Sequence, residues 1–294
     1  MNKWTMDVNF RHDRLKKNHP AFKLDNIEYL KALYDLMKPR VMSLAIFTCV
    51  VGFLIAPFKN VDYLYAVLSI TAVALGSGAA GALNCWYEAD VDSIMSRTCL
   101  RPIPTGKLTK KQALIFGTIS SFISVGALYF FSNLMAASLL ALTILFYVFV
   151  YTIWLKRKTP QNIVIGGAAG ALPPVIGWSI ATGGVSVEPI ILFLIIFIWT
   201  PSHFWALSLF KSDDYRKANI PMLPVISGIE TTKKNILVYS ILLFPVALAP
   251  FYLKFLGLIY LSFSLPLSAY YVFICFKLFK AKDEKSQKII AKQI

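Results

Sequence analysis

The sequence predicts an all-α fold, a polytopic transmembrane helical bundle, and three observations lead to that prediction. Hydrophobic residues make up 57% of the 294 residues and charged residues 15%, where soluble domains average roughly a quarter charged. The mean hydropathy is +0.61. Long stretches such as 235–253 and 256–276 carry no charged residue. Stretches of this kind are stable in lipid, so the chain is expected to cross a membrane several times.

Eight apolar segments have the length that a bilayer crossing requires, about 20 residues each. They cover residues 41–57, 64–84, 112–131, 134–154, 162–182, 189–209, 235–253 and 255–276. An even number of crossings puts both ends of the chain on one side of the membrane. We therefore expect an N-terminal tail over 1–40, a transmembrane domain over 41–276 and a basic C-terminal tail over 277–294.

The basic residues predict the orientation. With the N-terminal tail in the cytoplasm, 28 of the 30 Lys and Arg residues lie on the cytoplasmic side, and Lys59 and Lys254 lie outside. Such a distribution follows the positive-inside rule. We expect an integral protein of the bacterial cytoplasmic (inner) membrane, with both tails and the long functional loops in the cytoplasm. The net charge of +15 then reflects orientation and contact with the lipid bilayer, and no nucleic-acid partner is expected.

The first candidate site follows the second apolar segment. Asn84, Glu88 and Asp92 are spaced four residues apart, so on a helix their side chains share one face. Neighbouring carboxylates near a low-dielectric bundle favour a hard cation, and Mg²⁺ is typically held by one or two carboxylates together with substrate phosphates. We predict a metal site at these three residues, with Arg97 and Arg101 binding phosphate. The alternative is an acidic helix end in salt bridges with the two arginines.

A second pair of carboxylates, Asp213 and Asp214, follows the sixth segment on the same predicted side, beside Lys211. We predict that this pair binds another Mg²⁺ and that the two acidic loops close over one diphosphate, whose oxygens accept hydrogen bonds from Lys and Arg. The alternative is an ordinary charged surface loop.

The ladder Asn84-x3-Glu88-x3-Asp92, followed by Arg97-Thr98-x2-Arg101-Pro102, resembles the first Asp-rich motif of the UbiA superfamily of intramembrane prenyltransferases. Five further strings, in order, are similar to those of its haem-farnesylating branch. They are Lys38-Pro39-Arg40-Val41, residues 154–162, residues 166–178, Pro201-x-His203-Phe204-Trp205-Ala206-Leu207 and Ile220-Pro221-Met222-Leu223-Pro224-Val225. The likeness extends from about residue 30 to 275.

Two positions depart from the pattern of that family. Glu88 stands where Asp is usual, and its longer side chain still ligates Mg²⁺. Asn219 stands where Gly is usual, before the Ile-Pro-Met-Leu-Pro string. Asn tolerates the left-handed backbone conformation, so we expect the turn to be kept. Members of the superfamily typically have nine spans and eight are visible here, which we interpret as a shortened C-terminal end.

The resemblance implies transfer of a farnesyl group from farnesyl diphosphate to a vinyl group of haem b, with addition of water, giving haem O and diphosphate. It also implies Mg²⁺ as the cofactor, and haem A synthase or haem-copper oxidase assembly proteins as partners. A quinone-precursor aromatic ring is an alternative acceptor within the superfamily. A cation-coupled transporter is less favoured, because the acidic residues lie in loops beside basic residues and not at mid-membrane.

Further residues are assigned by what this reaction needs. An allylic diphosphate ionises when its leaving group is neutralised, and we expect Arg40, Lys156 and Lys211 to assist Arg97 and Arg101 in binding it.

The allyl cation needs a dry cavity and aromatic faces. Tyr147, Tyr151 and Trp178, which we expect in the same cytoplasmic half of the membrane, and Tyr215 are the predicted pocket residues. The alternative for these rings is an interfacial aromatic belt. His203 lies about two turns before the second acidic pair, so we predict a catalytic contact with haem, through its iron, a propionate or the added water. The alternative is a hydrogen bond to a neighbouring group.

Overall fold

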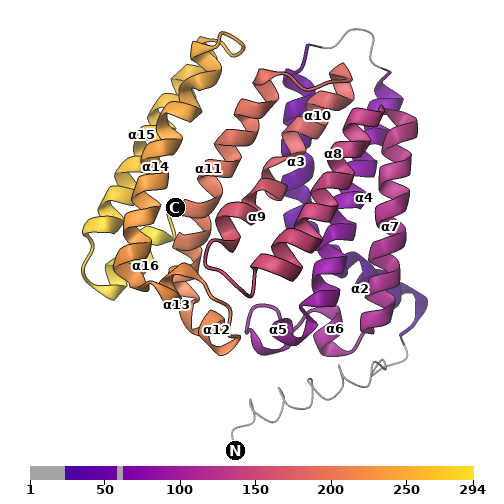
Figure 1. The fold of residues 1–294 in the computed structure, drawn as a ribbon, viewed down its shortest axis with the longest axis horizontal. Helices are drawn as coiled ribbons and strands as arrows, with labels where there is room; N and C mark the ends of the chain where they lie inside the picture. The colour runs from indigo at the N-terminus through magenta and orange to yellow at the C-terminus, as the bar shows by residue number, and fades with distance from the viewer. Residues whose placement is uncertain (1–23, 58–61) are drawn as a thin grey trace, which may run out of the picture. The chain divides into compact units, whose positions relative to one another are not determined.

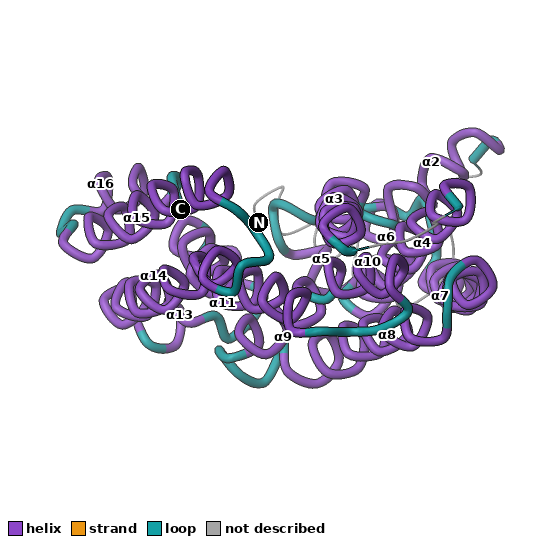
Figure 2. Tube along the Cα trace, turned by 90° about the horizontal axis from the view of Figure 1, so that it is seen from above, coloured by secondary structure: helices purple, strands orange, loops and turns teal. Residues whose placement is uncertain are grey.

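The computed structural model describes residues 24–57 and 62–294, and within them every regular element is a helix (Figure 2). Residues 1–23 of the predicted tail and Lys59 lie outside the described residues. The chain divides into two compact units, which are described separately. Unit 1 holds the described residues up to Trp154 together with Ile176–Gly184, and unit 2 holds Leu155–Val175 and Val185–Ile294.

Unit 1 is built on α4, which packs along α7 and also contacts α3 and α8 (Figure 1). Its elements are α2 (Asn26–Leu36), α3 (Pro39–Ile55), α4 (Tyr63–Tyr87), α5 (Ala89–Ile94), α6 (Pro102–Thr105), α7 (Lys110–Phe131), α8 (Leu134–Leu145), the π-helix η1 (Phe146–Leu155) up to Trp154, and most of α10 (Pro173–Thr182). Two apolar cores hold them. One core joins α3, α4, α7, α8 and α10, and the other joins α2 to α4 and α7 at the end where α5 and α6 lie.

Unit 2 is built on α11, which packs against α14 and α9, while α14 packs against α15. Its elements are α9 (Asn162–Ala171), α11 (Val187–Phe210), α12 (Ser212–Lys217), α13 (Leu223–Ile226), α14 (Gly228–Tyr252), α15 (Leu258–Lys280) and α16 (Glu284–Ala291). The core of the unit gathers Trp205 and Ala206 of α11 with residues of α13, α14, α15 and α16.

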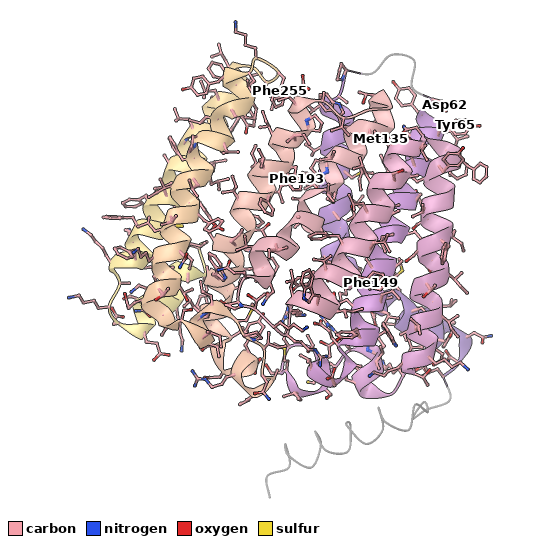
Figure 3. All side chains as sticks on the ribbon, in the orientation of Figure 1. Asp62, Tyr65, Met135, Phe149, Phe193 and Phe255 are labelled. Carbon is pink, nitrogen blue, oxygen red and sulfur yellow. The ribbon has the colours of Figure 1, made fainter. Side chains whose placement is uncertain are left out.

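The predicted membrane spans are found with small shifts at their ends. In the described residues seven helical segments are long and apolar enough to cross a membrane, and they match the second to eighth predicted segments. The first segment corresponds to α3, which is bent by 57° from α2 and gives an eighth span if the bent pair is counted as one. Large apolar side chains point outward, such as Met135 and Phe149 of α8 and η1 (Figure 3), with exposed fractions of 42% and 58%. The chain is an integral membrane protein, in which lipid covers such side chains.

The bend between α2 and α3 has a local cause. Lys38 adopts the left-handed conformation, with φ 56° and ψ 63°, and Pro39 then begins α3, where its missing N–H leaves no hydrogen bond unmade. The corner lies directly on α4, because Gly81 has no side chain: a Cβ there would lie 3.0 Å from the backbone oxygen of Met37. Small residues of α4 therefore place Lys38 against the end of α4 that carries Asn84.

Candidate active site

The acidic ladder lies at the junction of α4 and α5. Helix α4 ends at Tyr87, Glu88 is the junction residue, and α5 begins at Ala89. The helical spacing expected from the sequence is present, because the Glu88 amide donates to the Asn84 carbonyl at 2.9 Å and the Asp92 amide donates to the Glu88 carbonyl at 2.8 Å. Asn84, Glu88 and Asp92 are all buried, with exposed fractions of 1%, 1% and 3%. Three oxygen-bearing side chains on one face of the α4–α5 segment are therefore shielded from water.

Lys38 is a cation at the ladder that the sequence analysis did not select. Its ammonium group donates a hydrogen bond to Oδ1 of Asn84. The sequence prediction chose Arg40 from the same string, but Arg40 is exposed at the first turn of α3. The role of Lys38 was not predicted, because the direction of its side chain depends on the left-handed backbone conformation at the bend. Its place immediately before Pro39, and hence at the start of a helix, was the available signal.

Asn84 is held on its other side by η1. Its Nδ2 donates to Oγ1 of Thr152 at 2.9 Å, and Thr152 is completely buried. Two helices far apart in sequence therefore meet at this amide. Thr152 was not predicted, since nothing in the sequence around it marks a buried hydroxyl with a partner.

Arg101 pairs with Asp92 at 2.7 Å, so part of the salt-bridge alternative is realised. Burial on its own would lower the pKa of Arg101, but the carboxylate of Asp92, with Glu88 nearby, outweighs burial and raises that pKa above its ordinary value. Arg101 thus stays positively charged beside the ladder. Arg97, in contrast, is exposed.

Two of the predicted aromatic residues lie together. The rings of Tyr147 and Tyr151 on η1 have centroids 5.3 Å apart, on the same π-helix as Thr152. The expectation that Trp178 faces the same half of the membrane was wrong. The next residue, Ser179, accepts a hydrogen bond through its carbonyl from Asn133 at 2.8 Å. Asn133 precedes α8, and the two tyrosines follow it by more than three turns, about 20 Å along the helix axis or more.

The second acidic pair forms the first turn of α12 in unit 2. The Asp213 side chain is 82% exposed and lies 3.9 Å from Arg216, whereas Asp214 and Tyr215 are half-buried. Asn219 has a φ of 53°, which confirms that Asn takes the left-handed turn. Because the two acidic segments belong to different units, their closure over one diphosphate stays a prediction.

The remaining predicted cations lie in or beside loops. Lys211, between α11 and α12, is exposed. Lys156 is half-buried in the short loop before α9. The buried side chain of Asn162 shapes that loop, because its Nδ2 donates to the carbonyls of Thr159 and Lys156 at 2.5 and 3.5 Å.

His203 lies on α11 against the ring of Trp199, with centroids 4.3 Å apart. Its Nδ1 donates to the backbone oxygen of Ile294 at 3.0 Å. Helix α16 reaches this position because Ala291 joins the core of unit 2. The predicted alternative, a hydrogen bond to a neighbouring group, is therefore realised, and the contact with haem stays a prediction.

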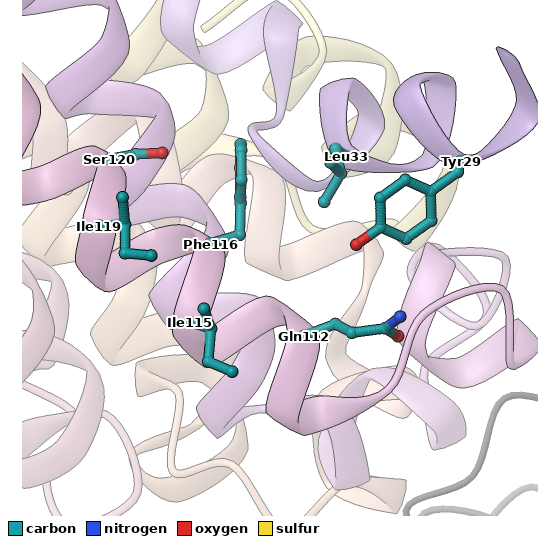
Figure 4. A pocket seen from close by; sticks show the side chains of 7 residues that line it. All are labelled: Tyr29, Leu33, Gln112, Ile115, Phe116, Ile119 and Ser120. Carbon is teal, nitrogen blue, oxygen red and sulfur yellow. The ribbon is translucent and has the colours of Figure 1, made fainter. Parts of the chain in front are cut away.

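A pocket of about 360 Å³ opens between α2 and α7. Tyr29 and Leu33 line it from α2, and residues of α7 from Gln112 to Ser120 line the other side (Figure 4). None of the predicted site residues lines this pocket.

The ladder fits the ligand preferences of Mg²⁺. No group of three or more His, Cys, Asp or Glu side chains in the described ranges could hold a metal ion unaided. A site of Asn84, Glu88 and Asp92 has two carboxylates and one amide oxygen, and Mg²⁺ commonly completes such a set with waters and substrate phosphates.

Comparisons with known proteins place the chain in a family. Residues 45–292 match the model of the UbiA prenyltransferase family. The chain belongs to that family. Protoheme IX farnesyltransferase of Pelagibacter ubique strain HTCC1062 is 63% identical over 269 residues, which are 92% of this chain and 88% of that relative. The protein of the same name from Parvibaculum lavamentivorans is 47% identical, over 95% and 87%.

Solved structures of UbiA proteins share the fold. A digeranylgeranylglyceryl phosphate synthase has a TM-score of 0.76 and 21% identity, covering 90% of this chain and 93% of its own. A UbiA homologue from Archaeoglobus fulgidus, bound to DMAPP and Mg²⁺, has a TM-score of 0.68 and 18% identity, covering 90% and 96%.

Proposed function

We propose that the chain transfers the farnesyl group of farnesyl diphosphate to a vinyl group of haem b, with addition of water, and releases haem O and diphosphate. The observation that carries this proposal is the 63% identity, over most of both chains, with a protoheme IX farnesyltransferase. The enzyme would work in the bacterial inner membrane, with its tails and acidic loops in the cytoplasm. Haem A synthase or haem-copper oxidase assembly proteins would be its partners.

Asn84, Glu88 and Asp92 would hold Mg²⁺, and Asp213 and Asp214 would hold a second ion. Mg²⁺ bound there neutralises the negative charge that the diphosphate gains as it leaves. The UbiA homologue from Archaeoglobus fulgidus bound to DMAPP and Mg²⁺ supports a metal-dependent site in this fold.

The cations of the chain bind the leaving group. Lys38 and Arg101 lie at the ladder and would donate charge-assisted hydrogen bonds to phosphoryl oxygens. Arg40 at the start of α3, together with Arg97, Lys156 and Lys211, would add positive charge for the same leaving group. Since Arg101 is now paired with Asp92, diphosphate binding would draw its guanidinium partly away from that carboxylate.

The aromatic pair protects the reactive carbon. The rings of Tyr147 and Tyr151 would face the allyl cation, and each cation–π contact is worth roughly 0.5–2 kcal/mol. Apolar surroundings keep water from quenching the cation before the vinyl carbon attacks. The carbon–carbon bond then forms, and water adds to the remaining cationic carbon with loss of one proton. His203 is the proposed haem-side residue, and it must give up its hydrogen bond to Ile294 to serve as an iron ligand through Nδ1.

Mass analysis of the haem product tests the function. Detergent-purified protein with haem b, farnesyl diphosphate and Mg²⁺ should yield haem enlarged by one farnesyl group and one hydroxyl group. Asp92→Asn should yield little, and 4-hydroxybenzoate offered in place of haem b should stay unprenylated. A prenylated aromatic acid would favour the quinone-precursor alternative, and absence of any haem adduct would overturn the proposal.

A further inference from the structure

The side-chain amide of Asn84 has a partner at each end. Its Nδ2 donates to Thr152 Oγ1 at 2.9 Å, and its Oδ1 accepts from the ammonium group of Lys38. The Thr152 hydroxyl in turn donates to the carbonyl of Tyr147 at 2.9 Å. These contacts form one chain of hydrogen bonds that runs from η1 through α4 to the bend before α3.

The direction of these hydrogen bonds follows from the number of hydrogen atoms that each group can donate. A hydroxyl has one hydrogen to donate, and Thr152 donates it to Tyr147. Towards Asn84 the hydroxyl can therefore act as an acceptor alone, and the amide must turn its NH₂ group to Thr152. Its oxygen then faces Lys38 and the acidic ladder. The reverse orientation would place an NH₂ group against an ammonium group and two hydrogen-bond acceptors against each other.

The π-helix makes this arrangement possible. A threonine in an α-helix commonly donates to the carbonyl four residues earlier, as Thr143 does to Leu139 at 2.7 Å in α8. Thr152 instead donates to the carbonyl five residues earlier, which is the π-helical spacing. Segments of π-helix are rare and occur frequently at functional sites.

We propose that Thr152 is a positioning residue that holds the Asn84 oxygen towards the metal and the diphosphate. This inference rests on the proposed function, in which Asn84 is a metal ligand. A hard cation binds the oxygen of an amide and not its nitrogen, so the orientation of the amide decides whether Asn84 is a ligand. The competing explanation is that the hydrogen bond merely ties two membrane helices together.

Thr152→Val and Thr152→Ser separate the two explanations. Val keeps the shape of Thr and removes the hydroxyl, whereas Ser keeps the hydroxyl. Mn²⁺ is the probe, because its binding to detergent-purified protein is measured by electron paramagnetic resonance without turnover. Thr152→Val should weaken Mn²⁺ binding by about 10- to 100-fold, as loss of a group that orients a ligand typically does. Thr152→Ser should bind within about threefold of the unchanged protein.

Thr143→Val is the matched control, since it removes a hydroxyl that is bonded within its own helix on the same span. It should leave Mn²⁺ binding unchanged. A Thr152→Val protein that binds Mn²⁺ normally, whether or not its thermal midpoint falls, would overturn the inference. If Thr152→Val does not fold, Thr152→Ala is compared with Thr152→Ser by the same measurement, and equal affinities would also overturn it.

The proposed function fails in a different way. If the unchanged protein does not bind Mn²⁺, or binds it equally well after Asp92→Asn, the ladder is not the metal site. If the unchanged protein and Asp92→Asn differ as expected while Thr152→Val has no effect, the role of Thr152 alone is refuted.

Discussion

Nη1 of Arg101 lies 2.8 Å from one carboxylate oxygen of Asp92 and 2.7 Å from the other. The Asp92 side chain is 4% exposed and that of Arg101 24% exposed, so the pair is mostly withdrawn from water. Thr98 completes the loop, because its hydroxyl donates to the Asp92 carbonyl at 3.1 Å. These contacts hold the side chain proposed as a metal ligand, and the loop around it, in place.

Arg101→Gln should therefore reduce both stability and activity. It leaves the buried Asp92 carboxylate without its counter-charge, and breaking such a pair from one side typically destabilises by about 3–5 kcal/mol, less here because Arg101 is partly exposed. Thermal unfolding in detergent measures the change. The double variant Arg101→Gln/Asp92→Asn should recover most of the lost stability and none of the activity. A double variant no more stable than Arg101→Gln would show that the pair does not stabilise this loop.

Lys38→Asn should lower kcat/KM for farnesyl diphosphate by about 10- to 100-fold, as expected for loss of one hydrogen bond to a charged group. Asn tolerates the left-handed backbone at this position, so the bend before α3 should survive. Arg40→Asn is the matched control and should lower kcat/KM by less than about fivefold, because Arg40 is exposed. The reverse order of effects would return the role to Arg40, as the sequence alone suggested.

Gly177→Ala should disrupt the contact between α3 and α10. A Cβ at Gly177 would lie 1.9 Å from the backbone oxygen of Cys49, and a backbone atom cannot move aside as a side chain can. We expect a loss of at least about 2 kcal/mol, since overpacking typically costs about 1–3 kcal/mol. Gly126→Ala, where a Cβ would have no neighbour within 4 Å, should be neutral or slightly stabilising. Equal thermal midpoints for the two variants would contradict this account.

Helix α16 should become less stable at acid pH. The Ser286 amide donates to the Asp283 carboxylate at 2.7 Å, and this hydrogen bond holds the pKa of Asp283 below its ordinary 3.8. A lowered pKa stabilises the helix at pH values above 3.8, and that stabilisation is lost as the pH falls through the lowered value. Hydrogen exchange of the α16 amides, corrected for intrinsic rates, should therefore show constant protection down to about pH 4 and less below it.

The control for this acid response is Asp283→Asn, because Asn caps a helix about as well as Asp and does not titrate. Glu284→Gln serves as the background, since Lys288 donates to Glu284 and lowers its pKa as well. In that background Asp283→Asn should keep α16 protected at neutral pH and abolish the loss below pH 4. An unchanged acid response would mean that another group governs the docking of α16.

The sequence predicted the fold well where apolar length decides the outcome. The second to eighth segments are helical, because twenty apolar residues satisfy their backbone groups in lipid as a helix. Most ends lie within a few residues of those expected, but α14 begins at Gly228, seven residues before the expected start, and the fifth segment is divided into α9 and α10. The first segment shows the limit. Hydropathy depends on which residues are apolar and not on backbone dihedral angles. The 57° bend at Lys38 could therefore not be predicted from it.

The candidate site could be predicted in part for a similar reason. The four-residue spacing of Asn84, Glu88 and Asp92 is a local property and survives the change from α4 to α5. Lys38 and Thr152 contact Asn84 through tertiary packing. No local sequence pattern around either residue indicates that contact. Trp178 was misplaced because it lies near the end of its span, and position along the span determines depth more strongly than residue type.

The hydrogen bond from His203 to Ile294 also guides how the protein should be handled. Any peptide fused behind Ile294 would begin beside the imidazole proposed to face haem, and a polyhistidine tag there would bring competing iron ligands to it. Purification handles and fluorescent reporters therefore belong at the other end of the chain. A protein tagged behind Ile294 that loses haem binding should be compared with the same protein after the tag has been cleaved.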